Sequence, residues 1–177
     1  MSTKNILLSG FGGQGILFAG KLLAYKGLIE DKNVSWLPSY GPEMRGGTAS
    51  CSVIISDQPV GSPIVSNPDI LVAMNLPSLD KFENSVKSGG MIFVDSSLVE
   101  RKVKRDDVTV FYVPATKTAG EKGFPTLANM VVMGKLLKET AGFDEQSVEK
   151  AVSKVISAKH KDMMQVNMNA LKTGAEF

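Results

Sequence analysis

The chain has 177 residues, of which 43% are hydrophobic, so it is long enough to bury a full core as a single domain spanning residues 1–177. Its net charge of only +2 and the lack of a long basic run argue against a protein that coats nucleic acid. No apolar run approaches the ~20 residues of a membrane span, and no signal-peptide core is found near the start. We therefore expect a cytoplasmic protein with neither nucleic acid nor membrane as a partner.

Strands and helices alternate along the chain. An apolar strand over 5–9 leads through a glycine-rich turn into a helix over 15–27, and a short strand follows over 34–38. The segment 48–56 alternates small polar and apolar residues, which is typical of a strand and suggests an antiparallel excursion. Further strands are predicted over 69–75, 91–95 and 108–113, and helices over 77–87, 125–140, 144–156 and 161–172, with a short helical piece within 114–123.

This order predicts an α/β fold with three layers, α/β/α, around a mostly parallel sheet that contains one or two antiparallel strands. The nearly continuous apolar runs 69–75 and 91–95 are typical of strands buried on both faces. The first strand, turn and helix form a Rossmann-like βα unit. In such sheets ligands bind beyond the carboxyl ends of the strands, where the segments following the first two strands are expected to lie.

The first candidate site is the turn Gly10-Phe11-Gly12-Gly13-Gln14-Gly15, which has the spacing G-x-G-x-x-G between a strand and a helix. Glycines let the backbone approach a ligand, and the free N–H groups at a helix start favour an anion such as phosphate. A dinucleotide site also needs an acidic residue at the end of the second strand, but Glu30 and Asp31 precede that strand. The glycines of this turn can serve a phosphate-bearing ligand, the backbone of a partner, or close packing alone, and all three interpretations remain open.

The second candidate is the segment 39–47, SYGPEMRGG, whose three glycines and one proline exclude a regular element. Arg45 would be the partner for a phosphate or carboxylate. Glu43 and Arg45 can equally pair with each other or with another chain, and a solvated loop is the plain alternative.

The sequence has few residues that could form a metal site, a disulfide or a nucleophilic catalytic site. Cys51 is the only cysteine and His160 the only histidine, so neither a disulfide, an iron–sulfur centre nor a usual zinc site is expected. Cys51 lies within a strand, where a small apolar role is expected, and His160 lies in a lysine-rich stretch and is expected to be exposed. No Walker lysine follows the glycine turn. The pattern fits a subunit whose chemistry is completed elsewhere.

The motifs GFGGQG, SYGPEMRGGTASCSVIIS, GSPIV, PDILVAMN and PSLDKF, together with Ala128-Asn129-Met130, identify a family resemblance. Over nearly its whole length the chain resembles the gamma subunit of 2-oxoacid:ferredoxin oxidoreductases, most of all the 2-oxoglutarate type. YGPEMRGG carries this resemblance more specifically than the glycine turn does.

The resemblance implies a complex that decarboxylates a 2-oxoacid on thiamine diphosphate, passes electrons through iron–sulfur clusters to ferredoxin, and releases an acyl-CoA. Alpha, beta and delta subunits would be the partners, and would hold the thiamine diphosphate and the clusters. The gamma subunit would support assembly and coenzyme A access without catalytic residues or a metal of its own. The residues assigned to that face are Gly10, Gly12, Gly13, Gln14, Gly15, Tyr40, Glu43, Arg45 and Gly46.

Two other functions remain open at this stage. One is a free-standing nucleotide-binding oxidoreductase with a Rossmann-like fold, and the other is a structural adaptor without a ligand. An apolar patch left bare by missing partners would favour a homodimer of the isolated chain.

Overall fold

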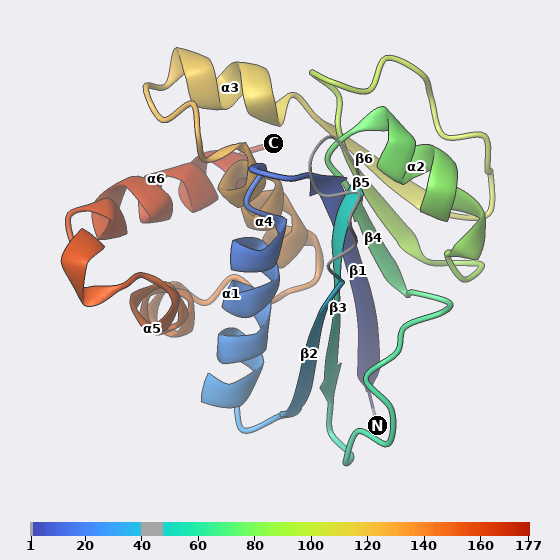
Figure 1. Ribbon diagram of the computed structural model, residues 1–177, viewed down its shortest axis with the longest axis horizontal. Helices are drawn as coiled ribbons and strands as arrows, with labels where there is room; N and C mark the ends of the chain where they lie inside the picture. The colour runs from blue at the N-terminus through green and yellow to red at the C-terminus, as the bar shows by residue number, and fades with distance from the viewer. Residues whose placement is uncertain (1, 40–47) are drawn as a thin grey trace.

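The computed structural model describes residues 2–39 and 48–177. Within these ranges the chain forms one six-stranded sheet with helices on both faces (Figure 1). In chain order the elements are β1 (Thr3–Phe11), α1 (Ile16–Ile29), β2 (Asn33–Ser39), β3 (Thr48–Ser56), β4 (Ile70–Ala73), α2 (Leu76–Phe82), η2 (Glu83–Ser85), β5 (Met91–Asp95), β6 (Thr109–Val113), α3 (Ala115–Glu121), α4 (Ala128–Glu139), α5 (Glu145–Val155), η3 (Ala158–His160) and α6 (Met163–Ala175).

The sheet has the order β2-β3-β1-β4-β5-β6. β1, β4, β5 and β6 pair in parallel, whereas β3 is antiparallel to both of its neighbours, β1 and β2. Because both β1 and β2 run opposite to β3, they run in the same direction and end at the same edge of the sheet. The predicted parallel sheet with an antiparallel excursion is therefore confirmed.

The strands follow from their side-chain patterns. β4 is buried at all four positions, as expected of a strand covered on both faces. β3 alternates: Cys51 and Val53 face one layer of helices, while Ser50 and Ser52, on the other face, are only half-buried. These patterns were sufficient to predict both strands.

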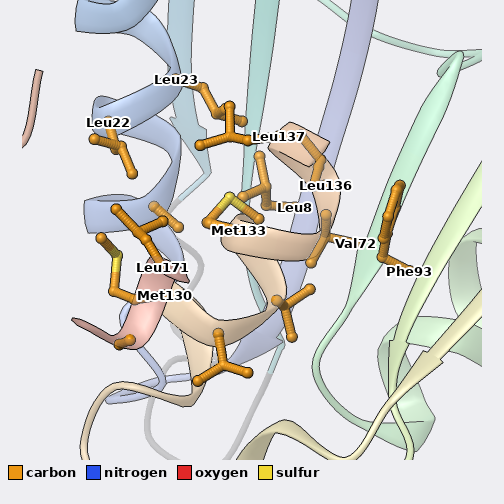
Figure 2. Packing of buried hydrophobic residues seen from close by; sticks show 14 of the residues in the cluster. Leu8, Leu22, Leu23, Val72, Phe93, Met130, Met133, Leu136, Leu137 and Leu171 are labelled. Atoms are coloured by element: carbon orange, nitrogen blue, oxygen red, sulfur yellow. The ribbon is translucent and has the colours of Figure 1, made fainter. Parts of the chain in front are cut away.

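Two apolar layers flank the sheet, so the three-layer prediction is confirmed. The larger layer packs α1, α3, α4, α5 and α6 against residues such as Leu8, Val72 and Phe93 (Figure 2). The smaller packs α2 and the connection before β6 against residues such as Leu7 and Ile92. Among the described residues this smaller layer contains no side chain of β2 or β3.

Some boundaries differ from the predicted ones. α1 continues past Gly27 to Ile29. The glycine lets the helix pass close to the sheet, because an added Cβ there would lie 2.8 Å from Val34 Cγ2. β4 ends before Asn75, whose side chain accepts a hydrogen bond from the Ser78 N–H and caps α2. α2 then ends at Phe82 and tightens into η2. The short helix within 114–123 is present as α3.

Candidate functional site

The turn between β1 and α1 takes a conformation that requires glycine. Gly13 has φ +92° and Gly15, the N-cap of α1, has φ +71°. Residues with a Cβ rarely adopt this left-handed region. At Gly13 an added Cβ would meet nothing within 4 Å, so the backbone conformation, and not crowding, is the reason for glycine there.

Gln14 holds the turn in place. Its Oε1 accepts a hydrogen bond from the Phe11 N–H at 2.6 Å, and its Nε2 donates to the Met74 carbonyl at 3.2 Å. The first bond closes the turn and the second ties it to the end of β4. Because both ends of the amide bond to backbone, the structure gives Gln14 a role in supporting the turn.

Asn129, at the start of α4, supports the turn from the other side. Its Nδ2 donates to the Gly15 carbonyl at 3.0 Å, and a Cβ on Gly15 would lie 2.4 Å from the same nitrogen. The close approach explains the glycine independently of its φ angle. Sequence reasoning did not count Asn129 among the site residues, although Ala128-Asn129-Met130 was one of the motifs that carried the resemblance.

The turn exposes a surface suited to an anion. Gly12 and Gly13 are exposed, α1 has no side-chain N-cap, and its first turn contains no acidic residue. The unpaired N–H groups at the start of this helix carry partial positive charge. Gly10 lies underneath, where an added Cβ would meet the Gln14 Oε1 at 2.6 Å.

Tyr40, Glu43, Arg45 and Gly46 of the second candidate segment lie outside the described residues, so their assignment stays a prediction. The residues on either side of that segment are described. Thr48 pairs with Phe11, and Ser39 pairs with Ser50 in the neighbouring strand. The chain therefore leaves and re-enters the sheet at the edge that bears the glycine turn.

The geometry does not favour a dinucleotide site. β3 lies between β1 and β2, so the end of β2 is one strand further from the turn than in a parallel β1–β2 pair. Glu30 pairs with Lys26 and lies near Ser2 and Lys4, at the start of β1 and the opposite edge of the sheet. Of the described residues, Glu30 therefore lies away from the turn, where a ribose would be held.

Cys51 and His160 behave as predicted. Burial raises the pKa of the Cys51 thiol to about 12, so it is neutral at physiological pH, and its side chain packs beneath α1. His160 is exposed. Among residues 2–39 and 48–177, no group of three or more His, Cys, Asp or Glu side chains is placed to hold a metal ion. Over the same residues, no helix combines the length and apolar character needed to cross a membrane.

The pattern that defines the family "Pyruvate ferredoxin/flavodoxin oxidoreductase" matches residues 5–177. The chain belongs to this family. The 2-oxoglutarate synthase subunit KorC of Methanocaldococcus jannaschii is 42% identical over 84% of the chain and 81% of KorC. The ketoisovalerate oxidoreductase subunit VorA of Methanothermobacter marburgensis is 40% identical over 97% of the chain, which spans only 36% of the length of VorA.

Solved structures agree with this assignment. The gamma subunit of a keto/oxoacid ferredoxin oxidoreductase from Geobacter sulfurreducens superimposes with a TM-score of 0.83 at 31% identity, covering 98% of this chain and 96% of that one. A 2-oxoglutarate:ferredoxin oxidoreductase from Magnetococcus marinus, with 2-oxoglutarate, coenzyme A and succinyl-CoA bound, shares the fold at 21% identity and a TM-score of 0.86, with 31% of its chain covered. The resemblance to gamma subunits inferred from the sequence motifs is thereby confirmed.

Proposed function

We propose that this chain is the gamma subunit of a multi-subunit 2-oxoacid:ferredoxin oxidoreductase. The strongest support is that the chain matches the separate gamma subunit from Geobacter sulfurreducens over nearly its full length, with 96% of that subunit covered. In the proposed complex, alpha, beta and delta subunits hold the thiamine diphosphate and iron–sulfur clusters. The complex oxidatively decarboxylates a 2-oxoacid, forms an acyl-CoA and reduces ferredoxin, and the isolated gamma chain is inactive.

The part proposed for this chain is to support assembly and coenzyme A access. Gly12 and Gly13 leave the backbone N–H groups of the turn open to a phosphate, and the start of α1 adds partial positive charge. Gln14 and Asn129 hold Phe11, Gly15 and the end of β4 in fixed positions, so the N–H groups need not reorganise when the anion binds.

The proposal assigns Arg45 a charge-assisted hydrogen bond to a phosphate or carboxylate. Tyr40, Glu43 and Gly46 would complete the rim of the same site. The positions of Ser39 and Thr48 support this part of the proposal, because both lie at the edge of the sheet that bears the glycine turn.

The remaining subunits need a surface to bind. Two large apolar side chains, Phe11 (40% exposed) and Leu37 (39% exposed), lie on the same face of the sheet as the half-buried Ser50 and Ser52. We assign this face to a partner subunit, and expect the isolated chain to self-associate through exposed apolar surface. The cytoplasmic location expected from the sequence remains part of the proposal, and fractionation of native cells tests it.

The substrate class is a 2-oxoacid, with 2-oxoglutarate proposed first because of the identity to KorC. VorA, with nearly the same identity, is named for ketoisovalerate, so both acids belong in the assay. A free-standing nucleotide-binding oxidoreductase would instead require the isolated chain to bind NAD(P) or FAD tightly.

Gly13→Val in the assembled complex tests the role of the turn, with Gly89→Val as a matched control. Both glycines have positive φ, +92° and +76°, and at both an added Cβ would meet nothing within 4 Å. Backbone strain is therefore similar, but Gly89 lies at the opposite edge of the sheet, before β5. We expect only Gly13→Val to raise the KM for coenzyme A or reduce the yield of complex.

If Gly13→Val and Gly89→Val give the same KM and the same yield of complex, the turn has no role in coenzyme A access. If Arg45→Ala also leaves both values unchanged, the chain acts as a structural adaptor.

A further inference from the structure

The edge strand β2 and the neighbouring helix α1 form a surface with no assigned role. β2 ends the sheet, and α1 runs alongside it (Figure 1). A notch of about 260 Å³ lies between them, lined by Lys21, Ala24, Tyr25 and Leu28 of α1 and by Trp36 of β2. Tyr25 is 37% exposed and Leu28 is 54% exposed. An apolar groove beside a strand at the edge of a sheet is suited to binding another strand.

The hydrogen bonds between β1 and β3 determine which backbone groups of β3 point toward β2. The Asp57 N–H donates to the Ser2 carbonyl at 3.2 Å, one step beyond the pairing of Thr3 with Ser56. In an antiparallel pair every second residue bonds to its partner strand. Counting in steps of two from Asp57, the odd-numbered residues of β3 bond to β1, and the even-numbered residues direct their N–H and C=O groups toward β2.

The same alternation determines the free groups of β2. Ser35 lies opposite Ile54, and Leu37 lies opposite Ser52, so the odd-numbered residues of β2 bond to β3. The N–H and C=O groups of Val34 and Trp36 therefore point away from the sheet. Within residues 2–39 and 48–177, no hydrogen bond satisfies these four groups. Unpaired backbone groups at a sheet edge are a template for another strand.

The free groups of β2 are complementary to those of a second copy in one register. If two β2 strands run antiparallel about a twofold axis at Ser35, Val34 of each copy lies opposite Trp36 of the other. Each pair exchanges two N–H···O=C bonds, so every free group of both residues is used. A twofold axis at Val34 would place Trp36 opposite Lys32, whose N–H already bonds within the turn after α1. An axis at Trp36 would place Val34 opposite Pro38, which has no N–H.

Helix α1 is placed to follow the same twofold axis. An added Cβ at Gly20 would lie 3.0 Å from Trp36 Nε1, and one at Gly27 would lie 2.8 Å from Val34 Cγ2. The middle of α1 is therefore level with Ser35. Rotation about the axis brings the two copies of α1 side by side and antiparallel, on the same face of the joined sheet.

This arrangement covers the exposed apolar side chains of α1. Directly opposite residues of an antiparallel pair share a face, so the second copy's Val34 lies beside Trp36 at the notch. Tyr25 and Leu28 face the second copy's α1, which removes their apolar surface from water. Lys21 lies toward the C-terminal half of that helix, whose end carries partial negative charge.

We propose that β2 and α1 form a homodimer interface, in which antiparallel β2 strands join two six-stranded sheets into one continuous sheet. A second copy is the occupant because the same few residues supply both halves of the hydrogen-bonding pattern, as a twofold interface requires. The inference does not depend on the proposed function. In an oxidoreductase complex it places two gamma subunits around one twofold axis.

Cross-linking through Ser35→Cys tests the register. Residues on the axis form a pair without hydrogen bonds, with Cα atoms about 4.5 Å apart, which is within the range of a disulfide. The natural cysteine, Cys51, is buried. The matched control is Asn33→Cys, which lies on the same strand and the same face. In this register it is opposite the second copy's Leu37 and roughly 13 Å from the second copy's residue 33.

The variants are expressed in native cells, and the extracts are oxidised mildly and analysed on non-reducing gels. We expect a disulfide-linked dimer from Ser35→Cys and none from Asn33→Cys, and a dimer again from the double variant Asn33→Cys with Leu37→Cys. No dimer from Ser35→Cys would overturn the proposal by leaving the edge free or covered by another subunit. Equal cross-linking from Ser35→Cys and Asn33→Cys would also overturn it, because random collision gives that result.

Sedimentation of the purified chain tests the helix contact. We expect Leu28→Glu to raise the dissociation constant of the dimer about tenfold or more, because a buried leucine contributes about 1.5–3 kcal/mol. The control is Ile64→Glu, an exposed apolar position in the loop before β4, which should leave the dimer unchanged. Circular dichroism checks that both variants fold. A monomeric wild-type chain, or a Leu28→Glu dimer as stable as the wild type, would overturn the proposal.

Discussion

Helices α4 and α6 cross so closely that two glycines face each other's backbone. A Cβ added at Gly134 would lie 1.9 Å from the Leu171 carbonyl oxygen, and one added at Gly174 would lie 1.8 Å from that of Val131. Real Cβ atoms essentially never approach within 3.0 Å, so Gly134→Ala requires the helices to separate locally by about 1.1 Å, which is 3.0 minus 1.9.

That separation disturbs a part of the core that is fully packed. Met130, Met133 and Leu171 are at most 1% exposed and belong to the same buried apolar cluster (Figure 2). Overpacking of this kind costs about 1–3 kcal/mol, and we use the upper end because the obstacle is backbone. Replacing glycine by alanine within a helix returns about 1 kcal/mol. The expected net destabilisation is about 2 kcal/mol, which lowers the Tm by about 4–8 °C in a chain of this size.

Urea unfolding followed by circular dichroism measures this effect, with Gly120→Ala as the control. Gly120 lies in α3, where an added Cβ would meet nothing within 4 Å, so alanine there should leave the stability unchanged or raise it slightly. The double variant at Gly134 and Gly174 should lose less than the sum of the two single variants, because one separation relieves both contacts. A Gly134→Ala protein as stable as the wild type would refute the reasoning.

Two further predictions concern single side chains. The Lys32 ammonium, hydrogen-bonded to the Asp57 carboxylate at 2.5 Å, lowers the pKa of Asp57 to about 2. Because this pKa is below the unfolded value of about 3.9, Asp57 stabilises the fold above pH ~4 and this contribution is lost as the pH falls from 4 to 2. Asp57→Asn should therefore flatten the stability curve in that range, and an unchanged curve would contradict the assignment. For Cys51, whose pKa burial raises to about 12, iodoacetamide at pH 8 should label the thiol only after unfolding, and rapid labelling of the native chain would show that it is accessible.

Much of the fold could be predicted because local patterns determine it. The continuous apolar run at 69–75 predicted a strand buried on both faces, and the alternation at 48–56 predicted a strand in an antiparallel excursion. Both are present, as β4 and β3. The glycine turn was located correctly because strand, turn and helix follow each other directly in the sequence. The insertion of β3 between β1 and β2 could not be predicted in the same way, since strand order depends on contacts between distant residues.

Side-chain partners far apart in the sequence were the main thing that sequence reasoning missed. Arg101, in the basic stretch 101–105, forms ion pairs with Asp80 and the buried Glu83, both at 2.6 Å. At the candidate site, Gln14 bonds to Met74 and Asn129 bonds to Gly15 across 114 residues. The pattern around an asparagine does not indicate such a partner, so its role became visible only in three dimensions.

The central claim is that this chain works as the gamma subunit of a 2-oxoacid:ferredoxin oxidoreductase. The most direct test is affinity purification of the tagged chain from its native cells, with the product assayed for viologen reduction that depends on a 2-oxoacid and coenzyme A. We predict co-purification of alpha, beta and delta subunits with activity on 2-oxoglutarate or ketoisovalerate, lost when coenzyme A is omitted. A chain that purifies alone, without activity, and binds NAD(P) or FAD tightly would contradict the account.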